Sequence, residues 1–181
     1  MKRARRCLTY LRDSSDLTMK YKRQMLKEPV TISTYCDSSY GNGENKKSIC
    51  GYVIVLNSSI VHFKSKQQSL TALSSTEAEF VSLILGLKDL LWIVQLLQEI
   101  PVIVGLRIIF CDNQGAIKIC TNQASTSRSK HIDIRLQRMK QHILSGECEI
   151  RYITTEDNVA DLFTKPLGRI RFEKLKQFFL A

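Results

Sequence analysis

The order of strand and helix patterns is the feature that most restricts what this chain can fold into. β-Branched and aromatic residues predict one strand over 30–36, a second over 51–56 and a third over 60–64, the last two joined by a tight turn at 57–59. No helical pattern separates these three segments. Three consecutive strands of this kind favour an antiparallel arrangement, with the second and third forming a hairpin.

Helical spacing begins after Ser74, and from there helices and strands alternate. The predicted elements are a long amphipathic helix ending near Pro101, a strand over 106–111, a short helix from 114, a helix from 132 to about 145, a strand over 148–152 and two helical segments, 158–164 and 169 onward. A parallel pair of strands is expected to join the first three. The predicted fold class is therefore α/β, a five-stranded mixed sheet with three antiparallel strands, then two parallel ones, flanked by helices.

Charge is concentrated at the two ends of the chain. Lys and Arg number 27 against 17 Asp and Glu, a formal net charge of +10 over 181 residues. Residues 1–27 hold nine basic and two acidic side chains, and residues 165–181 hold five and one. This distribution excludes a uniformly basic, histone-like chain. It favours a polyanionic partner that is met at the edges of a nearly neutral body.

Compartment and membrane association follow from three further observations. The basic start of the chain lacks the apolar stretch of a signal peptide, and the most apolar segment, 80–97, is interrupted by Lys88, Asp89 and Gln95. The six cysteines form no CxxC pair, which favours free thiols in a reducing compartment over structural zinc. An intracellular protein with no membrane partner is expected.

Trp92, among apolar helix neighbours, is predicted to be a core residue.

Two strands end in the same way, with Cys36-Asp37 and Cys111-Asp112. Adjacent side chains on a strand point to opposite faces, so each Asp faces away from the core if its Cys enters it. The carboxyl ends of strands are where open α/β sheets usually build their sites. The competing interpretation is that each Asp only begins a turn, which is the more common role of a single Asp after a strand. Because two strands end with the same Cys-Asp pair, the two interpretations are about equally supported.

The helix start Ser74-Ser-Thr-Glu77-Ala-Glu79 contains two overlapping capping boxes, Ser74 with Glu77 and Thr76 with Glu79. Both cannot cap the helix. The two acids are about 200° apart around the helix, so at most one can reach a shared site. If Ser74 and Glu77 form the cap, Glu79 is left without a structural role.

Asp161 is the fourth candidate, although an acid in a first helical turn is by default a solvated residue. Three or four carboxylates that converge from separate elements repel one another unless cations bind them. Their hard oxygen atoms suit Mg²⁺ or Mn²⁺. Two such ions ~4 Å apart would activate water and stabilise the leaving oxygen of a phosphodiester.

Five strings occur along the chain in this order: TYCDSSYG, SSTEAEF, IIFCDNQG, SKHID and VADLFTKPL. With these strings the chain closely resembles the ribonuclease H domain that ends the Pol polyprotein of copia-type LTR retrotransposons. The resemblance runs from about residue 29 to the end. The resemblance implies that the chain has two parts. Residues 1–28 would be the tail of the preceding reverse transcriptase, and residues 29–181 would be the ribonuclease H domain. The polymerase itself is not within these residues, so a fragment of a larger reading frame is expected.

The resemblance implies both an activity and its residues. The four metal-binding acids of the family fall on Asp37, Glu79, Asp112 and Asp161. By analogy, two Mg²⁺ (or Mn²⁺) ions would position water for attack on the RNA strand of an RNA/DNA hybrid, leaving a 3′ hydroxyl and a 5′ phosphate. The implied partners are that hybrid and the reverse transcriptase of the same polyprotein. The implied location is the cytoplasm, inside a virus-like particle for an active element, with the nucleus as an alternative.

Some features leave other interpretations open. Bacterial and retroviral relatives place a His shortly before the last Asp, and residues 154–160 contain none. His131 is a possible substitute, or it organises a helix start together with Asp133. A second hypothesis is a non-catalytic remnant that binds nucleic acid or supports a polymerase. A nucleotide-binding α/β domain is the weakest alternative, because no Gly-rich phosphate loop is present.

Overall fold

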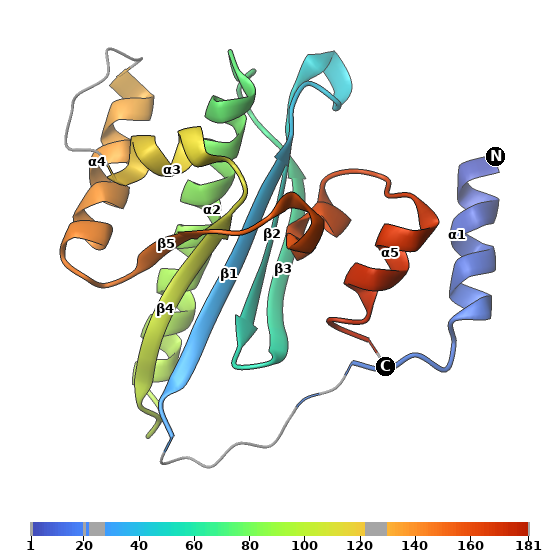
Figure 1. The fold of residues 1–181 in the computed structure, drawn as a ribbon, viewed down its shortest axis with the longest axis horizontal. Coiled ribbons are helices and arrows are strands. Elements are labelled where there is room, and N and C mark those ends of the chain that lie inside the picture. Colours follow the sequence, from blue (N-terminus) through green and yellow to red (C-terminus); the bar gives the residue numbers. More distant parts are fainter. Residues whose placement is uncertain (1, 20, 22–27, 122–129, 181) are drawn as a thin grey trace.

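A single five-stranded sheet organises the chain, whose computed structural model describes residues 2–19, 21, 28–121 and 130–180 (Figure 1). The elements in chain order are α1 Lys2–Asp13, β1 Val30–Ser39, η1 Glu44–Lys46, β2 Ile49–Leu56, β3 Ser59–Gln67, α2 Ser75–Gln98, β4 Val104–Cys111, α3 Gln114–Thr121, α4 Lys130–Leu144, β5 Glu149–Tyr152, η2 Thr155–Asp157, η3 Val159–Phe163 and α5 Arg169–Lys176. The η elements are short 3₁₀ helices.

The strands lie in the order β3-β2-β1-β4-β5. β1 and β3 both pair with β2 in antiparallel fashion, whereas β4 runs parallel to β1 and β5 runs parallel to β4. The β2–β3 hairpin turns at Asn57, whose φ of 55° is the left-handed conformation that tight hairpin turns use. The predicted α/β class and the mixed sheet, three antiparallel strands followed by two parallel ones, are confirmed.

α2 covers one face of the sheet and forms the main core with β1, β2 and β4 (Figure 1). Even-numbered positions of β1 point into this core, among them Ile32 and Cys36, which are fully buried. The helix approaches β1 closely at Gly86, where a Cβ atom would lie 2.6 Å from the Cys36 sulfur. A larger residue there would push the helix off the strand that carries Asp37.

Two expectations about α2 are corrected. By length and composition alone the helix could cross a membrane, contrary to the prediction that no segment could, but half of its most apolar window is buried inside the fold. It is the core helix of this sheet. Trp92 is not a core residue, because its side chain is 58% exposed whereas its neighbours Ile93 and Val94 are buried.

The C-terminal segment covers the opposite face of the sheet, where η3 and α5 pack on β2 and β1 (Figure 1). Val53 and Val55 of β2 form a second, smaller core with Val159 and Leu175. Odd-numbered residues of β1 face this side, because side chains alternate along a strand. Asp37 therefore faces η3 while Cys36 lies in the main core, as the alternation of the sequence predicted.

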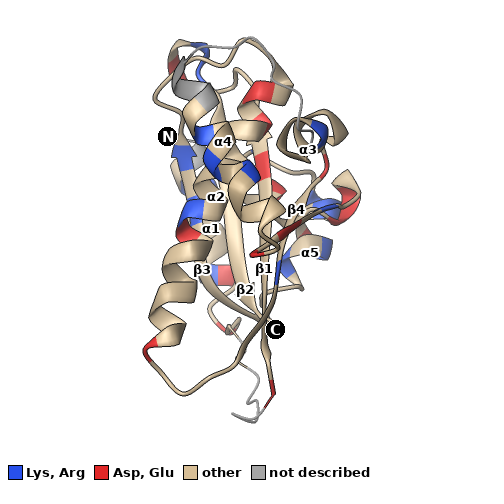
Figure 2. Ribbon diagram, turned by 90° about the vertical axis from the view of Figure 1, so that its left-hand side faces the viewer, with Lys and Arg blue, Asp and Glu red and all other residues tan. Residues whose placement is uncertain are grey.

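α1 lies beside α5 at the outer edge of the molecule (Figure 1). The Tyr10 ring meets the Phe172 ring edge to face with centroids 5.5 Å apart, and the Lys176 ammonium lies over the Tyr10 ring. Met19 forms an isolated β-bridge with Leu180, so the segment that follows α1 meets the segment that follows α5. Basic residues recur along both helices (Figure 2). The two basic ends noted in the sequence thus adjoin each other in the fold.

Candidate active site

Asp37 lies inside β1, not at its end. The strand was expected to stop near Cys36, but it continues to Ser39 because Ser38 and Ser39 pair with β2. Pairing, and not side-chain preference, keeps these serines in the strand. The Asp37 side chain is 2% exposed and accepts a hydrogen bond from the Thr164 hydroxyl. The first candidate acid is therefore a buried group fixed from two elements.

Glu79 lies one turn into α2, and the contacts at the start of this helix show that Glu79 takes no part in the N-terminal cap. The Ser74 hydroxyl accepts a hydrogen bond from the Glu77 backbone N–H at 3.1 Å, and the Glu77 carboxylate accepts one from the Leu73 N–H at 2.8 Å. The cap is therefore Ser74 with Glu77. Glu79 is buried, with one carboxylate oxygen 3.2 Å from the Ser38 backbone nitrogen, which donates to it. Its other oxygen, Oε2, is buried with no hydrogen-bond partner in the described part of the chain.

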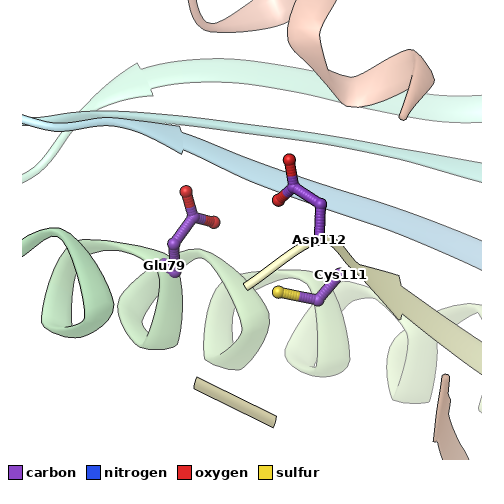
Figure 3. A group of neighbouring side chains, drawn as sticks. All are labelled: Glu79, Cys111 and Asp112. Atoms are coloured by element: carbon purple, nitrogen blue, oxygen red, sulfur yellow. The ribbon is translucent and has the colours of Figure 1, made fainter. Parts of the chain in front are cut away.

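Asp112 follows β4 and approaches Glu79. The ligand atoms of Glu79, Cys111 and Asp112 all lie within 4.8 Å of one another. The two carboxylates extend to the same side of the chain, whereas the Cys111 sulfur points toward α2 (Figure 3). Burial raises the pKa of the Cys111 thiol far above its usual range and so favours its protonated form. The Thr155 hydroxyl donates to Asp112 at 2.7 Å and fixes its orientation.

Asp161 is fully buried in η3 and faces Asp37. The expectation that it is solvated by default is wrong. The Lys165 ammonium lies 2.7 Å from an Asp161 oxygen and 3.5 Å from an Asp37 oxygen, and the Arg171 guanidinium forms a second ion pair with Asp161. Asn158 caps η3 and donates to the Cys36 carbonyl at 2.9 Å, so η3 is tied directly to β1 beside Asp37.

Burial and mutual repulsion raise the pKa of two of the four carboxyl groups. The pKa of Glu79 rises to about 9, mainly because the group is buried and further because of the negative charges of Asp37 and Asp112. The pKa of Asp161 rises to about 7, again mainly through burial and then through Asp37, although Lys165 opposes the rise. Buried acids with strongly raised pKa values are typical of functional sites.

Several residues of the site were not predicted from the sequence. Lys165 follows Asp161 at helical i, i+4 spacing, which is the one local signal that indicated an ion pair. No sequence pattern indicated the contacts of Thr155 and Thr164 with the acids, and Arg171 reaches Asp161 only because α5 returns to the sheet. The side chains of His131 and Asp133, which were candidates for a supporting role, lie outside the described residues.

Gly51 sets the distance between η3 and the sheet. It pairs with Asp37 across the β1–β2 ladder, and a Cβ atom there would lie 2.5 Å from the Thr164 Cγ2 and 3.0 Å from the Ala160 carbonyl oxygen. We expect Gly51→Ala to push η3 off β2, lowering any activity of the site by about 10²-fold, since ~1 Å of misplacement has such effects. The unfolding free energy should fall by ~1–3 kcal/mol.

The matched control is Gly168→Ala, because a Cβ at Gly168 has no atom within 4 Å. Urea denaturation and initial rates of both variants would check the prediction. Equal behaviour of the two variants would show that the contact between η3 and Gly51 does not position the acids.

A hollow of about 740 Å³ lies between α1 and α5 and contains none of the four acids. It is lined by basic and acidic side chains, including Arg5, Arg6, Arg169 and Lys176. The acids themselves lie where β1, α2, β4 and η3 meet.

Comparison with known sequences places similar segments in much longer proteins. No protein-family model matches the chain. The chain is 32% identical over 151 residues to the retrovirus-related Pol polyprotein from transposon TNT 1-94 of Nicotiana tabacum, covering 83% of the chain and 11% of that protein. It is 31% identical over 175 residues to the corresponding polyprotein from transposon RE2 of Arabidopsis thaliana, covering 96% and 12%. The chain thus spans about a tenth of the length of these relatives.

Comparison with solved structures identifies the fold. The N-terminal ribonuclease H domain of rv2228c from Mycobacterium tuberculosis, solved as a fusion with maltose-binding protein, superposes with a TM-score of 0.54 at 15% identity, covering 82% of the chain and 97% of that structure. LC11-RNase H1 in complex with an RNA/DNA hybrid gives a TM-score of 0.55 at 15% identity, covering 74% and 93%. The sheet order and the flanking helices described above are those of the ribonuclease H fold.

Proposed function

Because this chain is a ribonuclease H-fold domain related to retrotransposon Pol polyproteins, we propose that it hydrolyses the RNA strand of RNA/DNA hybrids. The proposed metal-binding acids are Asp37, Glu79, Asp112 and Asp161. The proposal is supported by two pairs of acids, Glu79 with Asp112 and Asp37 with Asp161, and by the Ser38 N–H, which holds Glu79 at the residue next to Asp37. One acid of each pair has a strongly raised pKa.

The donor set fits a hard divalent cation. The four acids offer carboxylate oxygens, and the buried Oε2 of Glu79 has no protein hydrogen-bond donor among the described residues. Glu79 and Asp112 also form no ion pair with a basic side chain there, in contrast to Asp37 and Asp161. A buried carboxyl group without a counter-ion either keeps its proton, as the raised pKa of Glu79 indicates, or binds a cation in its ionised form. Mg²⁺ and Mn²⁺ prefer such oxygen ligands.

The protein's own side chains would orient the reacting groups. Two Mg²⁺ ions, when bound by the four acids, would supply an activated water and neutralise charge on the phosphodiester. Thr164 and Thr155 hold Asp37 and Asp112 in place by hydrogen bonds, and the Ser38 N–H holds Glu79. Such fixed orientation avoids reorganisation during the reaction. The expected products are a 3′ hydroxyl and a 5′ phosphate.

Recognition of the hybrid would use charge and shape. α1 and α5 contribute basic side chains, among them Arg5, Arg6, Arg169 and Lys176, to the hollow between them, where these side chains suit the phosphate backbone of a duplex. Selection of the RNA strand would come from the 2′-OH and the geometry of the hybrid. In the longer polyprotein, we propose the reverse transcriptase domain as the partner that delivers the hybrid.

The test is cleavage of an end-labelled RNA/DNA hybrid by the full chain in Mg²⁺. We expect cleavage of the RNA strand alone, no cleavage when EDTA replaces Mg²⁺, and no cleavage of DNA/DNA or RNA/RNA duplexes. Hybrid binding without turnover, independent of Mg²⁺ and weakened by salt, would instead support the non-catalytic alternative, which the basic ends favour. That result would contradict the proposed activity.

A further inference from the structure

The four acids divide into two halves that differ in their protein cations. Asp37 and Asp161 share the Lys165 ammonium, and Asp161 also pairs with Arg171. Glu79 and Asp112 are held only by a backbone N–H and a hydroxyl, with no basic partner in the part of the chain that the structure describes. One half of the cluster therefore has basic ion-pair partners in the protein, whereas the other half has none among the described residues.

We propose that Lys165 is a resident counter-ion that competes with a divalent cation for the Asp37–Asp161 pair, so that the two halves of the cluster bind metal with unequal affinity. This inference rests on the proposed function, because it concerns the same acids. It assigns Lys165 a role that the four-acid pattern does not contain.

Distances show why the two cations exclude each other. The Lys165 nitrogen lies 2.7 Å from one Asp161 oxygen and 3.5 Å from an Asp37 oxygen. A divalent cation that contacts both carboxylates would sit about 2.0–2.6 Å from its oxygen ligands. It would therefore occupy the space where the ammonium now lies, and the two positive charges would repel each other strongly. A cation that contacts only Glu79 and Asp112 meets no basic side chain at ion-pair distance among the described residues.

Lys165 is the cation able to leave. Its side chain is 31% exposed, and a four-carbon flexible stem can carry the ammonium into solvent or toward a phosphate. Arg171 is less free, because its guanidinium also donates to the Thr155 carbonyl at the end of the adjacent loop. When a divalent cation binds the Asp37–Asp161 pair, the Lys165 ammonium would therefore move away while Arg171 stays in place.

A purely structural ion pair makes a different prediction. In both cases the removal of the Lys165 charge leaves the buried Asp37 without an ion-pair partner and Asp161 with Arg171 alone, so the chelated protein becomes less stable. Only competition predicts that the same change tightens metal binding. Metal affinity, measured without substrate, therefore separates the two roles.

In the experiment, bound metal is first removed from the full chain with a chelator, and Mn²⁺ is then titrated in. Binding is measured by calorimetry and by the electron paramagnetic resonance signal of Mn²⁺. The variants are Lys165→Gln, which keeps hydrogen-bonding capacity without charge, and Lys165→Arg, which keeps the charge. The matched control is Lys174→Gln, because Lys174 pairs with Asp157 and both side chains are more than half exposed.

We expect two unequal classes of site in the wild-type chain. In Lys165→Gln the Mn²⁺ affinity of the weaker class of site should rise about tenfold. In Lys165→Arg it should stay within about twofold of wild type, because the positive charge is kept. In Lys174→Gln it should also stay within about twofold, since removal of a screened surface charge has little effect. Mn²⁺ should also raise the melting temperature of Lys165→Gln by more than it raises that of wild type.

The outcomes distinguish this inference from the proposed function. Unchanged or weaker binding in Lys165→Gln, together with loss of binding in Asp37→Asn, would overturn the role of Lys165 and leave the metal site standing. No Mn²⁺ binding by any form would overturn both. If Lys165→Gln does not fold, Lys165→Arg still tests the inference, because a bulkier cation that tightened Mn²⁺ binding would contradict competition by charge.

Discussion

Asp37→Asn is expected to lower the rate of hybrid cleavage by about 10³-fold, the size of effect seen when one preorganised electrostatic group of an active site is removed. The substitution keeps the shape of a side chain that is almost fully buried and hydrogen-bonded to Thr164, but removes its charge. The amide is a weaker ligand for Mg²⁺ and no longer attracts Lys165. Initial rates on a labelled hybrid in Mg²⁺, with hybrid affinity measured in parallel, check the prediction.

The matched control for this experiment is Asp157→Asn. Asp157 lies in the same C-terminal region and pairs with Lys174, but its side chain is 56% exposed. We expect its loss to change the rate by less than about twofold, as for an exposed ion pair. Comparable rates in Asp37→Asn and wild type would contradict the proposed site, whereas equal losses in both variants would indicate an effect of net charge on hybrid binding.

The sheet was predictable because its strands differ in pattern from the helices around them. The alternation in β1 correctly placed Cys36 in the core and Asp37 on the other face. The end of β1 was less predictable, since Ser38 and Ser39 are strand residues only through pairing with β2. Trp92 was assigned to the wrong environment because α2 is apolar on nearly every side, so periodicity does not identify its buried face.

The acids were predictable to different degrees. The residues alone offered all four acids as candidates, but with a structural alternative for each: a turn for Asp37 and Asp112, a cap for Glu79, and a solvated acid for Asp161. The resemblance assigned all four to metal binding. The burial of Asp161 was the least predictable feature, because it depends on η3 docking against Gly51. The partners that hold the acids, Thr164 and Arg171, come from segments far along the chain, and no local pattern indicates contacts of that kind.

Glu79→Gln is expected to abolish cleavage and yet to stabilise the chelated protein at alkaline pH. Burial raises the pKa of Glu79 to about 9, compared with ~4.3 for an exposed glutamate. Between these two pH values the folded chain holds a proton that the unfolded chain has lost. The contribution of Glu79 to stability is therefore full below pH ~4.3, and it is lost as the pH rises toward 9.

Glutamine resembles the protonated acid at every pH, so this dependence should disappear in the variant. At pH 8.5 in EDTA we expect Glu79→Gln to exceed wild type by on the order of 2 kcal/mol, or about 4–8 °C in melting temperature for a domain of this size, with little difference at pH 5. Mg²⁺ should stabilise wild type and reduce this gap. Thermal denaturation at both pH values, with and without Mg²⁺, provides the measurement.

Glu77→Gln is the control, because Glu77 lies on the same helix and serves in its N-terminal cap. It should show no gain at pH 8.5. If Glu79→Gln were instead no more stable than wild type in EDTA, burial and repulsion would not raise the pKa of Glu79 as described above. A gain in stability with a loss of cleavage would show that the fold tolerates an unfavourable charge at this position, since that charge is what allows the site to bind a cation.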